Sequence, residues 1–195
     1  MENSSVISPR SSRNPAGVPN RRALIVLFAL VILLPPANAI AKETRQRVTD
    51  TRAIFPSRIG LFARHGRVEL DNAGDPLAHY WAGSLVLASA YFYRTSSHSL
   101  EREYSDCKDQ VKINSPSARL ISDSAFSVSG HRGKRAIFTA QKGPLADRGP
   151  AKSQLVIFMA GDRFLKFRIT YPIAHAERAE KEIDLFLRSF PWPKG

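Results

Sequence analysis

The chain has 195 residues, with 29 Lys and Arg against 17 Asp and Glu and a formal net charge of +12. Its hydrophobic fraction of 43% is that of a globular domain, which excludes a disordered chain. The single cysteine, Cys107, excludes an intramolecular disulfide. Stability must therefore come from a packed core.

Residues 1–39 have the features of a secretory signal peptide. Two arginines precede an unbroken apolar run over residues 23–34, and two prolines follow it. Twelve helical residues span only ~18 Å, whereas a bilayer core of ~30 Å needs about 20 residues. Ala37 and Ala39 occupy the −3 and −1 positions of a cleavage site. We expect Sec-type export with cleavage after Ala39, which gives a periplasmic or secreted protein; the alternative is an N-terminally membrane-anchored protein.

The first part of the mature chain is predicted to be a flexible arm followed by strands. Residues 40–53 are polar and basic without an apolar period, so we expect a flexible basic arm there. A single α+β domain is expected over residues 54–193. Its first strands are predicted at 61–70, 77–81 and 85–93. Residues 85–93 alternate between two faces that are both mostly apolar, which indicates a central strand covered on both sides.

The apolar period then changes from that of a strand to that of a helix. Leu100, Tyr104, Cys107 and Val111 share one helical face, and the sequence from Asn114 to Pro116 ends that helix. Further strands are predicted at 119–128, 135–141, 154–159 and 163–171, with a tight Gly161-Asp162 hairpin before the last. A broad apolar stripe over residues 176–190 predicts a C-terminal helix that stops before Pro191.

This order of elements predicts an α+β fold. We expect a mainly antiparallel sheet, with the mid-chain helix and the C-terminal amphipathic helix packed on it. The segments 83–93 and 164–172, and the closing helix that ends in Phe190-Pro191-Trp192-Pro193, carry a resemblance over about residues 54–193. The chain resembles small secreted bacterial domains of unknown function with a PsbP-like sandwich architecture. That resemblance implies a non-catalytic accessory role.

None of the local catalytic or metal-binding motifs is present. Residues 130–135 contain Gly-Lys, but only two residues separate the glycines and Arg135 follows the lysine, so a phosphate-binding loop is excluded. No two histidines lie at i, i+2 or i, i+4, and the Gly-x-Ser-x-Gly motif is missing. We therefore expect no cofactor and no local metal motif.

Two groups of residues allow more than one interpretation. Cys107 is a candidate nucleophile if a histidine lies beside it, but its place on the apolar stripe favours a buried, unreactive thiol. The aromatic segments 79–81 and 91–93 either line a ligand groove or belong to the core. Their position on strands of a sandwich favours the core.

Positive charge is concentrated in two segments. Residues 40–67 contain seven basic and two acidic residues, and residues 130–152 contain six and one. The second segment is expected to form a basic hairpin tip and loop. Its candidates for binding an anionic surface are Arg132, Lys134, Arg135, Lys142, Arg148 and Lys152. The alternative is a solvated basic surface that aids solubility.

The sequence thus favours an exported, non-catalytic accessory or binding domain. Its expected partner is an envelope protein or an anionic envelope surface; nucleic acid is excluded by export and by the lack of a stacking motif. The alternative is a hydrolase-type envelope enzyme whose site is assembled only by the fold. A concave pocket with convergent His, Asp or Cys side chains would favour the enzyme.

Overall fold

The computed structural model describes residues 54–94, 96, 99–140, 145 and 149–193. The predicted signal peptide at 1–39 and the basic arm at 40–53 lie outside the described residues. Within the described part of the chain, no helix has both the length and the apolar character needed to span a membrane.

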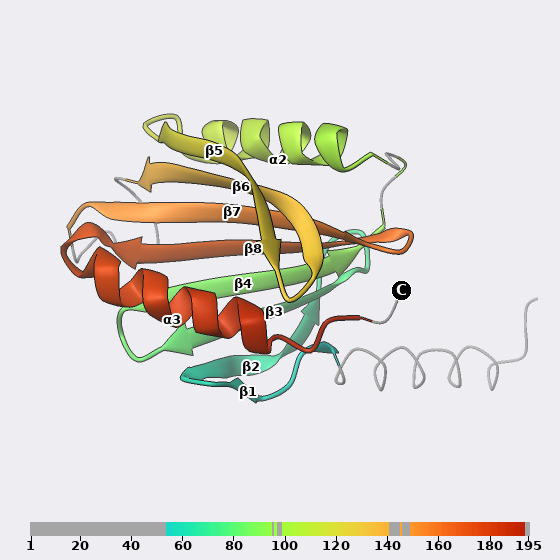
Figure 1. Cartoon of the computed structure of the whole chain (residues 1–195), viewed down its shortest axis with the longest axis horizontal. Coiled ribbons are helices and arrows are strands. Elements are labelled where there is room, and N and C mark those ends of the chain that lie inside the picture. Colours follow the sequence, from blue (N-terminus) through green and yellow to red (C-terminus); the bar gives the residue numbers. More distant parts are fainter. Residues whose placement is uncertain (1–53, 95, 97–98, 141–144, 146–148, 194–195) are drawn as a thin grey trace, which may run out of the picture. The chain divides into compact units, whose positions relative to one another are not determined.

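Eight strands form one antiparallel sheet, in the order β1-β2-β3-β4-β8-β7-β6-β5 (Figure 1). The first half of the sheet comprises β1 (Arg58–Ile59), β2 (Phe62–Leu70), β3 (Pro76–Ala82) and β4 (Val86–Tyr93). The second half comprises β5 (Arg119–Val128), β6 (His131–Ala140), β7 (Ala151–Ala160) and β8 (Arg163–Pro172). The halves are two meanders joined edge to edge, because β4 pairs with β8. The predicted α+β fold is confirmed.

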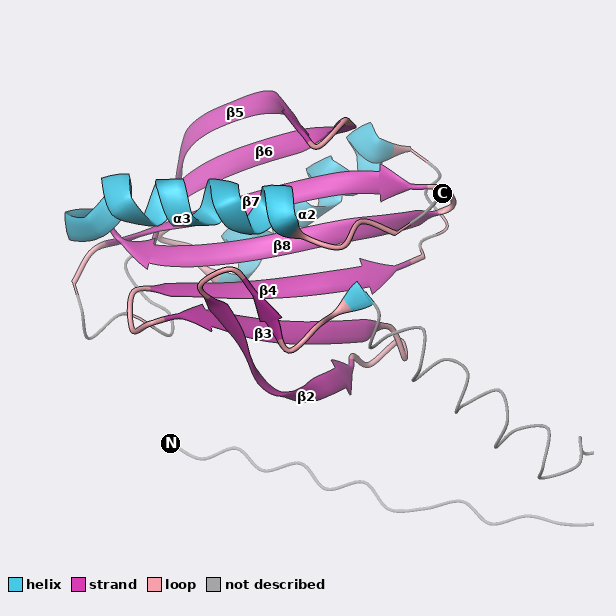
Figure 2. Cartoon of the chain, turned by 60° about the horizontal axis from the view of Figure 1, so that its bottom comes forward, coloured by secondary structure: helices cyan, strands magenta, loops and turns pink. Residues whose placement is uncertain are grey.

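Two helices pack on opposite faces of this sheet. Helix α2 (Leu100–Asn114) connects the two meanders, and α3 (Ala176–Ser189) follows β8 through a short 3-10 turn. Figure 2 shows α3 in front of the sheet and α2 behind it. Both helices have the positions along the chain that the apolar spacing predicts.

The larger core lies between the sheet and α3. Its centre is Phe186 of α3, whose ring lies 4.4 Å from that of Phe62, 5.5 Å from Tyr80 and 5.9 Å from Phe167. The chain end also contributes, because Trp192 packs edge-to-face on Phe158 at 4.7 Å. This face is closed by aromatic side chains from both meanders and from the C-terminal segment.

The opposite face of the sheet is covered unevenly. Helix α2 packs on β6 and β7, and its Tyr104 and Val111 join a smaller apolar cluster there. On β3, by contrast, the residues that face α3 are buried whereas those on the α2 side are only half-buried. The α2 face of β3, β4 and β8 therefore stays partly open to solvent.

Several local predictions can be compared with the strands. The two-residue turn at Gly161-Asp162 is confirmed, since Ala160 pairs with Arg163. Strand β4 is central as expected, but its expected cover on both faces is incomplete, because Leu87 and Tyr91 are only half-buried. The predicted start of β6 at Arg135 is wrong, because the strand begins at His131. Ser129 and Gly130, with φ of 50° and 81°, already complete the turn, so the following residues can pair with β5.

Candidate anion-binding site

The predicted basic tip is not a tip. Arg132, Lys134 and Arg135 lie within β6 and Lys152 lies within β7, while Lys142 and Arg148 fall outside the described residues. Successive side chains of a strand point to opposite faces, so the structure does not bring these cations onto one surface. Their role in docking to an anionic surface stays a prediction.

Most of the described members of this group already have partners. Lys134 Nζ lies 2.9 Å from a carboxylate oxygen of Glu101 on α2, and Lys152 Nζ lies 3.1 Å from Glu180 on α3. The Arg135 guanidinium lies over the Phe126 ring at 4.6 Å. Arg132 is exposed. The positive charge of this segment is therefore partly neutralised by the fold.

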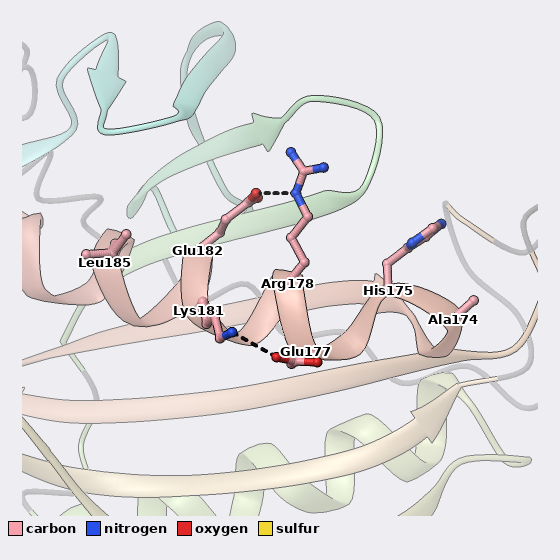
Figure 3. Close-up of a pocket in the computed structure, with 7 residues that line it drawn as sticks. All are labelled: Ala174, His175, Glu177, Arg178, Lys181, Glu182 and Leu185. Atoms are coloured by element: carbon pink, nitrogen blue, oxygen red, sulfur yellow. Dashed lines mark hydrogen bonds and ion pairs between the residues drawn. The ribbon is translucent and has the colours of Figure 1, made fainter.

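A shallow depression of about 450 Å³ lies on the outer side of α3 (Figure 3). Its lining comes entirely from residues 174–185. The four charged helical residues form i, i+4 pairs, Arg178 with Glu182 at 2.9 Å and Lys181 with Glu177 at 2.8 Å. Because one helix supplies every group and its charges are paired, this depression brings together no groups suited to bind a ligand.

A different set of residues converges on the open part of the α2 face. The register of β3, β4 and β8 arranges their side chains in three rows. The rows are Leu77–Tyr91–Lys166, His79–Ser89–Arg168 and Trp81–Leu87–Thr170. All of these residues are half-buried except Ser89, which is 8% exposed. The two cations, Lys166 and Arg168, are neighbours on β8, and the rest of the patch is polar, aromatic or aliphatic. We call these nine residues the open-face patch.

Arg168 is the central group of the open-face patch. Its Nη2 donates a hydrogen bond to Ser153 Oγ at 3.1 Å, and burial lowers the pKa of its guanidinium. An arginine has five N–H donors, and its burial is uncommon without a carboxylate partner. Among the described residues, however, no carboxylate forms an ion pair with Arg168. This guanidinium is a half-buried positive charge without a counterion in the described chain.

Lys166 adds a second cation two residues away on the same face of β8. Its Nζ lies 4.5 Å from the ring centre of Tyr91 and 4.8 Å from that of Tyr93. Such cation–π contacts hold an ammonium group in place without neutralising it. Lys166 likewise has no ion pair with a described carboxylate. Together, Lys166 and Arg168 create a positive potential on a partly desolvated surface, where charge interactions are stronger than in water.

Hydroxyl groups lie on both strands beside Arg168, with Ser89 opposite it on β4 and Ser153 bonded to it from β7. His79 Nδ1 and Ser89 Oγ are 2.8 Å apart, and Ser153 Oγ lies 3.5 Å from Thr170 Oγ1. The buried carboxylate at the α2 border belongs to Glu103, whose Oε1 accepts hydrogen bonds from Tyr93 at 2.7 Å and Cys107 at 3.3 Å. That carboxylate is therefore bound to neutral donors rather than to the cations.

Cys107 does not have the character of a nucleophile. The side chain is half-buried beside Tyr93. Burial raises the pKa of the Cys107 thiol, although the nearby charge of Lys166 opposes the shift. The thiol therefore stays protonated at neutral pH, whereas catalysis requires the thiolate. Its predicted place on the inner face of the helix is confirmed, but its burial is only partial.

The aromatic segments 79–81 and 91–93 were expected to belong to the core, with a ligand groove as the alternative. The core expectation is confirmed for Tyr80, Phe92 and Tyr93, which are buried. It is wrong for His79, Trp81 and Tyr91, which are half-buried on the open side. The cations Lys166 and Arg168 were missed as site residues. The sequence signal for them was a strand near the centre of the sheet in which basic residues alternate with apolar ones.

Within the described segments, no group of three His, Cys, Asp or Glu side chains could hold a metal ion.

No model of a known protein family matches the chain, and no curated protein matches it in sequence. Similar solved structures include the cyanobacterial PsbP (CyanoP) of Synechocystis sp. PCC 6803, with a TM-score of 0.45 and 12% identity over 67% of this chain and 81% of that chain. A protein of unknown function from Pseudomonas aeruginosa has a TM-score of 0.41 and 13% identity, covering 64% of this chain and 95% of its own. The Ran-binding protein Mog1p of Saccharomyces cerevisiae has a TM-score of 0.38 and 9% identity, covering 58% and 75%. These likenesses concern the arrangement of elements alone, and the cyanobacterial PsbP among them has the architecture that the sequence resemblance led us to expect.

Proposed function

We propose that this domain is a non-catalytic binding domain that holds an anionic group of its ligand against Arg168 and Lys166. The observation that carries this proposal is the pair of half-buried cations without a described counterion. Burying a charge is costly unless it is paired, and a bound anion would pair with these two cations, for which the described residues offer no carboxylate. The planar guanidinium suits a carboxylate or phosphate, since it can donate two parallel hydrogen bonds.

The chemistry of the patch favours binding over catalysis. The hydroxyl of Ser89 and the imidazole of His79 are in contact, as a nucleophile and its base would be. Ser89 is nevertheless only 8% exposed, and in the described chain no carboxylate makes a hydrogen bond to orient His79. Burial raises the pKa of the Cys107 thiol, which disfavours the reactive thiolate. The patch thus offers groups that can bind an anion without a developed nucleophile.

The test compares anion binding by matched charge variants. Arg168→Met removes the guanidinium while keeping a long side chain, and Arg132→Met makes the same change at an exposed site of β6. We expect acetate or phosphate, at constant ionic strength, to raise the unfolding midpoint of wild type and Arg132→Met. An anion concentration of a hundred times Kd adds ~2.7 kcal/mol to the free energy of unfolding. This gain should be lost in Arg168→Met. Equal anion effects on all three proteins would refute the proposal.

We also propose that the protein acts outside the cytoplasm. The support is the short apolar run at 23–34 followed by small residues at the cleavage position. The intact mass of exported protein should correspond to a chain that begins at Ile40. A membrane-bound species that retains residues 1–39 would establish the anchored alternative instead.

The proposed partner class is an envelope protein or an anionic envelope surface. Exposed Arg132 supports a contribution of the basic segment at 130–152, whereas the ion pairs of Lys134 and Lys152 reduce it. Near an anionic membrane each free basic residue contributes about 1 kcal/mol. Sedimentation with anionic and neutral vesicles across a salt series tests this contribution. Equal sedimentation with both kinds of vesicle at low salt would leave the charge as a solubility feature.

A further inference from the structure

The residues beside the two cations indicate which class of anion the patch would take. On β3 and β4 the rows that flank His79–Ser89 contain Leu77 with Tyr91 on one side and Trp81 with Leu87 on the other. These four side chains are half-buried rather than exposed. They place apolar side chains on either side of the polar pair His79–Ser89, and we call these two apolar pairs the walls. Both walls lie on the same face as Lys166 and Arg168.

We propose that the ligand is a small aromatic monocarboxylate, with its carboxylate on Arg168 and Lys166 and its ring between Tyr91 and Trp81. This inference rests on the proposed function, because it takes the same two cations as the anion-binding groups. Its new content is the apolar body of the ligand and the residues that contact it.

The dimensions of the sheet limit the size of that body. Neighbouring strands are ~4.8 Å apart, so β8 and β3 are separated by about 10 Å. A ligand with its carboxylate at β8 and a single ring on a short chain is long enough to reach β3. Flat aromatic side chains provide large contact area with a polar edge and pack well against another ring. The hydroxyl of Ser89 and the ring of His79 lie beneath the middle of the ligand, where they can meet one polar substituent.

Charge and hydration favour a carboxylate over a phosphate ester. A phosphate dianion also complements two cations, but its transfer into a half-buried, partly apolar site costs more because it carries the greater charge. A carboxylate forms a bidentate pair with the Arg168 guanidinium. Lys166 is held over two tyrosine rings and attracts the carboxylate as a point charge, without forming a second bidentate pair. The ligand is therefore a monoanion attached to an apolar ring.

The experiment uses four probes that separate the charge from the ring. They are 3-phenylpropionate, its uncharged amide, acetate and phenyl phosphate. The protein has two tryptophans, so Trp192→Phe leaves Trp81 as the sole tryptophan and its emission reports ligand contact. We expect 3-phenylpropionate to bind at least tenfold more tightly than acetate and the amide, and more tightly than phenyl phosphate. Emission of Trp81 should change with 3-phenylpropionate and stay unchanged with acetate.

Variants then assign each part of the ligand to its residues. In the otherwise wild-type protein, Trp81→Leu should remove most of the advantage of 3-phenylpropionate over acetate while leaving acetate binding unchanged. Arg168→Met should weaken both. The control is Leu185→Ala on α3, where the native leucine is 60% exposed. This variant should alter the binding of neither 3-phenylpropionate nor acetate. Leu87→Ala gives a second test of the apolar wall if Trp81→Leu lowers the unfolding midpoint.

The outcomes distinguish the two proposals. If acetate binds in an Arg168-dependent manner but the ring adds less than threefold, the aromatic ligand is wrong and the anion site stands. A tenfold preference for phenyl phosphate would replace the carboxylate by a phosphate ester. If no probe shows Arg168-dependent binding, the proposed function and this inference both fail.

Discussion

Replacing Gly133 by alanine should destabilise the domain, although alanine is normally the better residue in a strand. Gly133 lies in β6 directly opposite Phe158 of β7, and both are buried. A Cβ at Gly133 would lie 2.5 Å from Phe158 Cδ1 and 2.9 Å from its Cε1, and it would also meet the carbonyl oxygen of Ile157. Carbon atoms normally pack ~3.5 to 4.0 Å apart. The ring must therefore shift by about 1 Å.

The surroundings leave little room for that shift. The Phe158 ring is packed against Trp192 at 4.7 Å and Phe126 at 5.9 Å, and Ile157 belongs to the strand ladder between β6 and β7. Overpacking of this kind costs about 1 to 3 kcal/mol. The gain from replacing a strand glycine is only about 0.5 to 1 kcal/mol. Since backbone and ring both oppose the new methyl group, we expect a cost near the top of this range, about 3 kcal/mol, and a net loss of about 2 kcal/mol.

Thermal unfolding followed by circular dichroism measures this loss. For a domain of this size, 2 kcal/mol corresponds to a fall of about 4 to 8 °C in the midpoint. Arg132→Ala, one residue away and exposed, is the control and should stay within ~0.5 kcal/mol of wild type. The cost of Gly133→Ala should also shrink in a Phe158→Leu background, because the smaller side chain relieves the ring contact. A Gly133→Ala protein as stable as wild type would refute this account of the glycine.

Three further predictions concern the helices and their contacts. Cys107 should react slowly with a thiol reagent in the native protein at neutral pH, because burial raises the pKa of its thiol; equal rates in native and denatured protein would contradict this. Asp123 accepts hydrogen bonds from Lys108 at 2.6 Å and Tyr104 at 2.7 Å, and the bond from Lys108 is the main cause that lowers the pKa of its carboxyl below 3.8. Its contribution to stability is therefore present above the unfolded-state pKa and lost as the pH falls through the folded-state pKa, so the difference in unfolding free energy between wild type and Asp123→Asn should shrink in acid. A difference that is constant from pH 6 to acid would contradict the linkage. Phe186→Ala should cost about 3 to 5 kcal/mol in a denaturant titration, because its ring contacts aromatic side chains of both meanders; a loss under ~1 kcal/mol would show that α3 is not held by this core.

The local period of the sequence determined the secondary elements to a large extent. Helix α2 was predicted from the spacing of its apolar residues, and β5 has the bounds that were expected. The division of β8 into an apolar face and a Lys166–Arg168 face also follows from alternation along the strand. These features depend on neighbours in the chain, because a helix or strand repeats its orientation every few residues.

The tertiary structure decided which charges are free and which are paired. Lys134 meets Glu101 and Lys152 meets Glu180, partners that are far apart in the sequence, so the predicted basic cluster is partly neutralised. Arg168 and Lys166 remain without a described carboxylate, because α2 packs mainly on β6 and β7 and its buried Glu103 is bonded to Tyr93 and Cys107. The lateral order of strands and the placement of a helix over some of them arise from long-range packing, which a local pattern does not encode. The sequence therefore predicted the faces of each element, and the packing of distant elements determined which face stays open to a ligand.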